Sequence, residues 1–349
     1  VIMDTNVMNE LIELCSVPGV SGREEKVREK IVYMLEKNNF GEKQKSLPDL
    51  SVDKIGNLIG KVPSRNNPES SKNVIVMAHM DEIGFYITSL RDDGKLEVRN
   101  VGGIIEDAIQ GSFVEVVTGN GIVDGVIGTV PPHLKSDGVV FEKVVDVGAR
   151  SKQELIDVGV SVMDYVVFKK HFSILNKEFL ALRSLDDRFG CYTLIESCKD
   201  ISPNSNLVFS WTVQEEVGLR GAKALLNHFA TFERVDFDLA IAVDSFACCS
   251  KQNKHIELGK GPVIRAYDNS SISAPDVVKF ILKLAEREGI PVQLGTTGGG
   301  NDASVFVEYG VPMVALSVPI RYLHSQVEML NIKDLLNLIK LLRLFLESF

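Results

Sequence analysis

Several short segments of the chain carry acidic or histidine side chains where an apolar run ends or a helix begins. In the first, His79 and Asp81 follow the apolar run VIVM and are two residues apart. A carboxylate at that spacing can accept the ring proton of the histidine and orient the ring toward a metal ion. On its own, the pair is better explained as a loop histidine beside a solvated aspartate.

Two adjacent aspartates, Asp186 and Asp187, stand at the start of a predicted helix. An aspartate there is a good N-cap, because its carboxylate accepts a free backbone N–H and interacts favourably with the helix dipole. Alternatively, one carboxylate bridges two cations while the other caps the helix. The sequence alone leaves both interpretations open.

The apolar run LVFSWTV leads into two adjacent glutamates, Glu215 and Glu216. A strand of this composition is expected to be buried on both faces, and burying unpaired carboxylates is costly. A metal ion would pair with one glutamate and leave the other free to act as a base. Solvent exposure at the end of the strand is the simpler alternative.

Asp244 closes the apolar run Leu239–Val243, and His324 lies in the segment PIRYLHS. Neither residue is convincing alone. Together, the five segments supply two histidines, three carboxylates and a spare glutamate. This set suits a carboxylate-bridged pair of divalent ions, each bound by one histidine and one aspartate or glutamate. Such a pair is a common hydrolytic centre.

Helical and strand patterns alternate around these segments. Helices are predicted at Val7–Ser16, Gly22–Asn38, Asp187–Cys198, Leu219–Phe229, Pro275–Glu288 and Ile332–Glu347. Strands are predicted at Val74–Met77, Leu207–Val213, Leu239–Val243 and Met313–Val318. The alternation predicts an α/β fold, a sheet with helices on both faces. Functional sites are normally built at the carboxyl edge of such a sheet.

A different pattern follows Asp81. Short β-type runs with little helical periodicity are found at Gly84–Leu90, Lys95–Val101, Phe113–Thr118 and Ile122–Val130. The sequence Gly-Asn-Gly at 119–121 predicts a hairpin between the last two. We therefore expect a smaller β-rich domain over residues 83–175. It would be inserted into a discontinuous catalytic α/β domain made of residues 1–82 and 176–349.

The composition is that of an ordinary globular protein, with 349 residues of which 45% are hydrophobic and 24% charged. A net charge of −9 disfavours nucleic acid and anionic membranes as partners. The five cysteines show no CxxC spacing, which favours free thiols and a cytoplasmic location. The most apolar stretch, residues 334–349, is interrupted by Lys340 and Arg343 and predicts an amphipathic helix rather than a membrane span.

The segments resemble the M42 aminopeptidases. Six motifs occur in the order typical of that family: HMDEIGF, LDDRFG, QEEVGLRGA, AVDS, GGGNDAS and RYLHS. The similarity covers nearly the whole chain, including the β-rich region with VGG, GVIGTVPPHL and VDVGARSKQEL. The resemblance implies an aminopeptidase of the co-catalytic zinc peptidase clan, with peptides as substrates. Family members often form dimers that assemble into dodecamers, with contacts made by the inserted domain.

The resemblance also implies a set of ligands for two divalent metal ions, zinc or cobalt. His79, Asp186 and Asp244 would hold one ion. Glu216, His324 and Asp186 would hold the other, so that Asp186 bridges the two.

Further roles are implied for the neighbours of these ligands. Asp81 would orient the first histidine, and Glu215 would be the general base. The peptide bond between Asp186 and Asp187 is expected to be cis, as in similar enzymes. One departure is Asn301 in GGGNDAS, where the family commonly has threonine. Because this loop lies near the substrate in such enzymes, the change bears on fine specificity rather than on the chemistry.

Two rival functions fit parts of the sequence. Paired carboxylates can hydrolyse glycosidic bonds without a metal ion, but a single tryptophan and 7% aromatic residues give little surface for stacking sugars. A non-catalytic assembly protein could retain the fold, but it would be expected to have lost some of the metal ligands, and none of the five is missing. Sensitivity to chelators distinguishes the glycoside hydrolase hypothesis from the metal-dependent aminopeptidase hypothesis.

Overall fold

The computed structural model describes residues 2–37, 48–248, 251 and 253–349. Its largest sheet has eight strands in the order β1–β2–β12–β3–β13–β17–β15–β16. In that order the strands span Asp49–Val52, Leu58–Val62, Asn206–Thr212, Asn73–His79, Leu239–Val243, Met313–Ser317, Val263–Tyr267 and Gln293–Thr296. Strands β12, β3, β13 and β17 are parallel, so their carboxyl ends meet at one edge.

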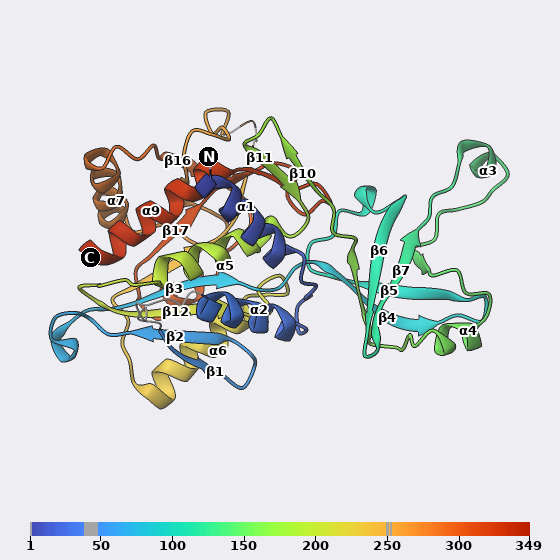
Figure 1. Ribbon diagram of the computed structural model, residues 1–349, viewed down its shortest axis with the longest axis horizontal. Helices are drawn as coiled ribbons and strands as arrows, with labels where there is room; N and C mark the ends of the chain where they lie inside the picture. The colour runs from blue at the N-terminus through green and yellow to red at the C-terminus, as the bar shows by residue number, and fades with distance from the viewer. Residues whose placement is uncertain (1, 38–47, 249–250, 252) are drawn as a thin grey trace.

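Helices cover both faces of this sheet (Figure 1). One layer contains α1 (Ile2–Cys15), α2 (Glu25–Glu36), α5 (Leu185–Cys198), α7 (Pro275–Arg287) and α9 (Ile332–Ser348); the other contains α6 (Arg220–His228) and α8 (Ser304–Val307). Val74 and Val76 pack into the core of the first layer, whereas Ile75 and Met77 pack into the second. The uninterrupted apolar run of β3 is explained by burial on both faces.

The structure confirms the mixed α/β fold, and the predicted elements agree with it to within a few residues. Leu239–Val243 is a strand as predicted, and α9 begins at Ile332. Helix α2 begins at Glu25 rather than at the predicted Gly22. The reason is local: Gly22 has a φ of 86°, in the left-handed region that a right-handed helix cannot contain. The predicted end of this helix, Asn38, lies outside the described residues.

Six strands close into a barrel in the order β4–β5–β8–β7–β6–β9, which lies to the right of the large sheet in Figure 1. They span Gly84–Leu90, Lys95–Val101, Val144–Asp146, Gly121–Ile127, Ser112–Thr118 and Tyr165–Phe168. The predicted hairpin is confirmed, because Thr118 pairs with Gly121. Strand β7 ends before the predicted Val130. The adjacent prolines, Pro131 and Pro132, have no N–H to continue a ladder, and the second begins a short helix.

The remaining elements are short. They are β10 (Phe172–Leu175), β11 (Phe179–Leu182) and β19 (Met329–Asn331) in one sheet, β14 (Phe246–Ala247) and β18 (Pro319–Ile320) in another, and the helices α3 (Pro132–Ser136), α4 (Lys152–Asp157), η2 (Pro68–Ser70), η3 (Glu106–Ala108) and η4 (Phe229–Glu233). Within the described parts of the chain, no helix has both the length and the apolar character needed to cross a membrane. Cys15, Cys191 and Cys198 are free and buried, whereas Cys248 is disulfide-bonded, so the expectation of free thiols is wrong for that residue.

Candidate metal centre

The carboxyl edge of the large sheet gathers the residues singled out from the sequence. His79 ends β3, the two glutamates follow β12, and Asp244 follows β13. Asp186 joins them from the start of α5, and His324 from the segment between β18 and β19. All six of these residues line one hollow with a volume of about 420 Å³. Segments far apart in the sequence therefore converge here because parallel strands end at the same edge.

The carboxylate of Asp186 lies between the two histidines. Its Oδ1 atom is 3.3 Å from His79 Nε2, and its Oδ2 atom is 3.3 Å from His324 Nε2. The Ser245 hydroxyl donates to Oδ2 over 3.0 Å, whereas Oδ1 is buried and has no hydrogen-bond partner among the described residues. One oxygen thus faces each histidine, which is what a carboxylate shared between two ions requires. The orphaned oxygen fits a metal ligand.

Asp187 contacts a residue of the site and is therefore more than an acid at the start of a helix. The peptide bond that joins it to Asp186 is cis, as predicted. Asp187 Oδ2 accepts the backbone N–H of His79 over 3.1 Å, and its Oδ1 atom forms no hydrogen bond with the part of the chain that the structure describes. Ligand atoms of His79, Asp187 and Asp244 lie within 4.8 Å of one another, as do those of His79, Asp186 and Glu216. The first of these groups contains Asp187 where the sequence-based set has Asp186.

Asp81 holds the two adjacent glutamates by their backbone. Its Oδ1 atom accepts the N–H of Glu215 over 3.0 Å, and its Oδ2 atom accepts the N–H of Glu216 over 3.1 Å. Ser21 donates to the same Oδ2 atom over 2.6 Å. His79 Nδ1 is 3.0 Å from the main-chain oxygen of Asp81 but 3.5 Å from its carboxylate. The carbonyl is therefore the nearer partner of the ring, while the carboxylate fixes the glutamate pair.

The two glutamates face different histidines. Glu215 Oε2 is 3.9 Å from His79 Nε2, whereas Glu216 Oε1 is 3.5 Å from His324 Nε2. Neighbours in the sequence therefore occupy different parts of the site, which permits the division of roles between ligand and base that the sequence suggested.

Gly103 and Arg265 belong to the site but were missed in the sequence. The Gly103 carbonyl is 3.0 Å from His324 Nδ1, and it comes from the loop after β5 of the barrel. A Cβ atom added at Gly103 would lie 2.9 Å from the same nitrogen. Arg265 is buried beside Asp244, with 3.7 Å between Nη1 and Oδ2, and it donates to the Gly300 carbonyl over 3.0 Å. A charged residue inside the apolar strand β15 was an available signal for Arg265, whereas nothing in the sequence distinguishes Gly103.

The electrostatics indicate a site with an excess of carboxylates. Burial raises the pKa of Glu215 well above its usual range and that of Glu216 to about 8. Burial alone would lower the pKa of His79, but Glu215, Asp186 and Asp81 outweigh it and raise that pKa well above 6.5. These shifts have one cause in common: several carboxylates are buried together with too little positive charge around them, and a bound cation would supply that charge. Oxygen and imidazole donors of this kind fit divalent ions such as zinc or cobalt.

A buried cluster of charged residues surrounds Glu82, which follows Asp81 in the sequence. Lys170 and the Ser184 hydroxyl contact one of its oxygens, and Arg188 Nη2 is 3.5 Å from the other. Burial alone would raise the pKa of Glu82, but Lys170, Arg188 and Arg183 lower it to about 2. Burial lowers the pKa of Lys170 to about 8. The two arginines also lower it, whereas Glu82 raises it. A single carboxylate is shared among three cations. The ionised form of Glu82 is therefore strongly stabilised, whereas the charged form of Lys170 is not.

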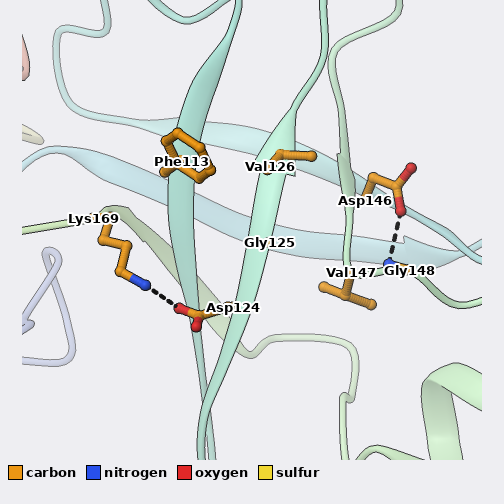
Figure 2. Close-up of a pocket in the computed structure, with 8 residues that line it drawn as sticks. All are labelled: Phe113, Asp124, Gly125, Val126, Asp146, Val147, Gly148 and Lys169. Carbon is orange, nitrogen blue, oxygen red and sulfur yellow. Dashed lines mark hydrogen bonds and ion pairs between the residues drawn. The ribbon is translucent and has the colours of Figure 1, made fainter.

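A second hollow, of about 460 Å³, lies on the barrel (Figure 2). It is lined by Phe113, Asp124, Gly125, Val126, Asp146, Val147, Gly148 and Lys169. Its charged groups are already paired: Lys169 contacts Asp124 at 2.7 Å, and Asp146 pairs with Lys95 and also accepts the N–H of Gly148 over 2.8 Å. Within the described residues, neither group of potential metal ligands includes a residue of this second hollow, and all members except Asp187 line the first one.

Comparisons with known proteins show the family of the chain. The family model of the M42 glutamyl aminopeptidases matches residues 56–341. The TET1 peptidase of Pyrococcus horikoshii, which can assemble into a tetrahedron or a large octahedral shell, is 44% identical with a TM-score of 0.87, over 98% of this chain and 100% of that one. The lysyl aminopeptidase of Pyrococcus furiosus is 33% identical over 99% of this chain and 97% of its own length. The aminopeptidase of Desulfurococcus kamchatkensis is 31% identical with a TM-score of 0.88, over 99% and 96%. The chain therefore belongs to the M42 glutamyl aminopeptidase family.

Proposed function

We propose that this metal-dependent aminopeptidase hydrolyses the N-terminal peptide bond of peptides with two divalent ions, zinc or cobalt, and a glutamate base. The observation that carries the proposal is the position of the Asp186 carboxylate. One of its oxygens faces His79 and the other faces His324. The first is buried, yet no described residue forms a hydrogen bond with it.

The ligands follow from this arrangement. His79 and Asp244 would hold one ion, Glu216 and His324 the other, and Asp186 would contact both. When bound, such ions lower the pKa of water and stabilise the negative oxygen of the tetrahedral intermediate. The adjacent Asp187 orients the backbone of His79, because its carboxylate accepts the N–H of that residue over 3.1 Å.

Glu215 is the proposed general base. It accepts a proton from the attacking water and then returns it to the leaving amine. A base with this double role needs a pKa above that of a free glutamate, and burial raises the pKa of Glu215 in that direction. The hydrogen bond from its N–H to Asp81 fixes the backbone from which the side chain enters the hollow.

The restriction to chain ends is supported by the relatives. The lysyl aminopeptidase of Pyrococcus furiosus, which matches 99% of this chain, is named for that activity, and so is the matching family. We therefore expect peptides with a free amino terminus to be the substrates.

We also propose that residues 83–175 form an inserted domain through which subunits associate into dimers and, from these, dodecamers. The closed barrel within this range supports the proposal. So do its exposed apolar side chains, among them Phe113 at 62% and Val140 at 73% exposure. The assembly of the related TET1 peptidase points the same way. Cys15, Cys191 and Cys198 are free and buried, which supports a cytoplasmic location, although Cys248 is disulfide-bonded.

The rival functions are not favoured. The single tryptophan, Trp211, is fully buried and donates its Nε1–H to the Cys191 carbonyl, so it offers no surface for a sugar. The described residues that line the hollow include no phenylalanine, tyrosine or tryptophan. A non-catalytic protein would have no use for an acidic cluster that is costly to bury.

A panel of aminoacyl-p-nitroanilides tests the proposal directly. The metal-free protein should be inactive, and zinc, cobalt or manganese should restore turnover. N-acetylation of the preferred substrate should abolish its cleavage. Full activity in the presence of a strong chelator, or equal cleavage of free and acetylated substrates, would exclude the proposed function.

A further inference from the structure

We propose that Glu328 is a positioning residue of the metal centre, which holds the backbones of Asp186 and His324 in a fixed relation to each other. The inference rests on the proposed role of these two residues as metal ligands. Glu328 Oε2 accepts the N–H of Asp186 over 3.1 Å, and Glu328 Oε1 accepts the N–H of His324 over 2.8 Å. A single carboxylate thus connects the proposed bridging ligand to a ligand of one ion.

The backbone at both ends needs such a partner. His324 has a φ of 61°, in the left-handed region that residues with a side chain rarely adopt. Asp186 has φ −77° and ψ 109°, which are not helical values although it stands at the start of α5. The N–H groups at a helix start have no acceptor within the helix, and a buried N–H without a partner is costly. The carboxylate of Glu328 supplies the acceptor for both groups at once.

Glu328 is itself fixed in place. It is fully buried beside β19, and its main-chain oxygen accepts the N–H of Leu182 in β11 over 2.8 Å. Arg183 Nη1 lies 3.8 Å from Glu328 Oε1, and the same side chain donates from Nη2 to the Ile83 carbonyl over 2.7 Å. The carboxylate is therefore anchored to a paired strand and an arginine before it contacts the ligands. Such outer contacts determine how firmly ligands are oriented toward a metal.

The alternative is that Glu328 only satisfies two buried amides and so stabilises the fold. The chain contains a matched example of this simpler role. Asp334 is also fully buried, and its two oxygens accept the N–H groups of Gly259 over 2.6 Å and Gly261 over 2.7 Å. Neither of these two hydrogen bonds goes to a proposed metal ligand. A comparison of the two carboxylates separates positioning from stability.

The test compares Glu328→Gln with Asp334→Asn. Each change replaces one acceptor oxygen with an NH2 group, which would face a backbone N–H. Both variants should lower the free energy of unfolding of the metal-free protein. Only Glu328→Gln should weaken the binding of zinc or cobalt, by roughly 10- to 100-fold, as is typical for the loss of an outer-shell contact. Competition with a chromophoric chelator measures this affinity, and the visible spectrum of the cobalt form reports on the ligand geometry.

Glu328→Asp keeps the charge and both acceptors but is one methylene shorter. It should fold even if the glutamine variant does not, and it should bind metal better than Glu328→Gln but less well than the wild type. Wild-type affinity and an unchanged cobalt spectrum in the Glu328 variants would overturn the positioning role and leave the proposed function standing. An equal loss of affinity in Asp334→Asn would also overturn it. A wild-type protein that binds neither ion would overturn both proposals.

Discussion

Replacing Gly103 with alanine should disturb His324 without removing any charge. The added Cβ atom would lie 2.9 Å from Nδ1 and 3.1 Å from Cε1 of the imidazole ring. Favourable contacts between such atoms need about 3.5–4.0 Å, so the ring or the loop must move by roughly 0.5 Å. The opposite ring nitrogen lies 3.3 Å from Asp186 and 3.5 Å from Glu216, and a shift of this size misaligns it with both. Outer-shell changes cost roughly 10- to 100-fold in metal affinity or activity, or about 1.4–2.7 kcal/mol.

The assay is kcat/KM for an aminoacyl-p-nitroanilide at limiting and at saturating zinc, together with zinc affinity by chelator competition. The loss of kcat/KM in Gly103→Ala should be seen mainly at limiting zinc, and kcat/KM should recover in part at high zinc. Gly128→Ala is the control, because its Cβ atom would meet nothing within 4 Å and its backbone is not left-handed. Wild-type zinc affinity in Gly103→Ala would refute the argument that the close contact at residue 103 determines the position of the His324 ring.

Three further predictions concern acid stability, substrate binding and assembly. Because the pKa of Glu82 is lowered from 4.5 to about 2, its contribution to stability is present above pH 4.5 and is lost as the pH falls toward 2. At pH 7, the free energy of unfolding of metal-free Glu82→Gln, measured by chemical denaturation, should therefore be about 3 kcal/mol lower than that of the wild type. This difference in free energy should become smaller below pH 4.5, and a difference independent of pH would contradict the prediction. Asn301 donates to Asp268 over 2.8 Å and to Ser271 over 3.1 Å, and a threonine could keep at most one of these hydrogen bonds. Asn301→Thr should therefore change KM several-fold. Its metal content, measured by elemental analysis, should stay the same. Sedimentation should show a species much larger than the 38.5 kDa chain, and a monomer at micromolar concentration would exclude the proposed assembly.

The strand ends of the site could be predicted from sequence because the apolar runs are unambiguous. His79 and Asp244 follow runs that are buried on both faces, and parallel strands bring such ends to one edge. The two aspartates at the start of α5 could not be separated. Both are acids at a helix start, and their difference lies in the directions of their carboxylates, which spacing does not encode.

The outer contacts of the site were beyond prediction for a different reason. Gly103 acts through its carbonyl oxygen and Glu328 through backbone N–H groups of remote residues. Every residue has a carbonyl and nearly every residue an N–H, so the sequence carries no signal for which of them meet. Only the packing of the barrel loop and β19 against the sheet edge brings these groups together.

The adjacent glutamates give the most direct test of the proposed mechanism. Glu215→Gln removes the base but no proposed ligand, so bound metal should stay near the wild-type level while kcat falls by roughly 10²- to 10⁴-fold or more. Glu216→Gln replaces an anionic ligand with a neutral amide, so it should lose metal and regain part of its activity when zinc or cobalt is added in excess. The measurement is a titration of both variants with either metal, following bound metal and turnover together. Loss of metal in Glu215→Gln with retention in Glu216→Gln would reverse the two roles, and near-normal turnover with full metal in both would contradict the mechanism.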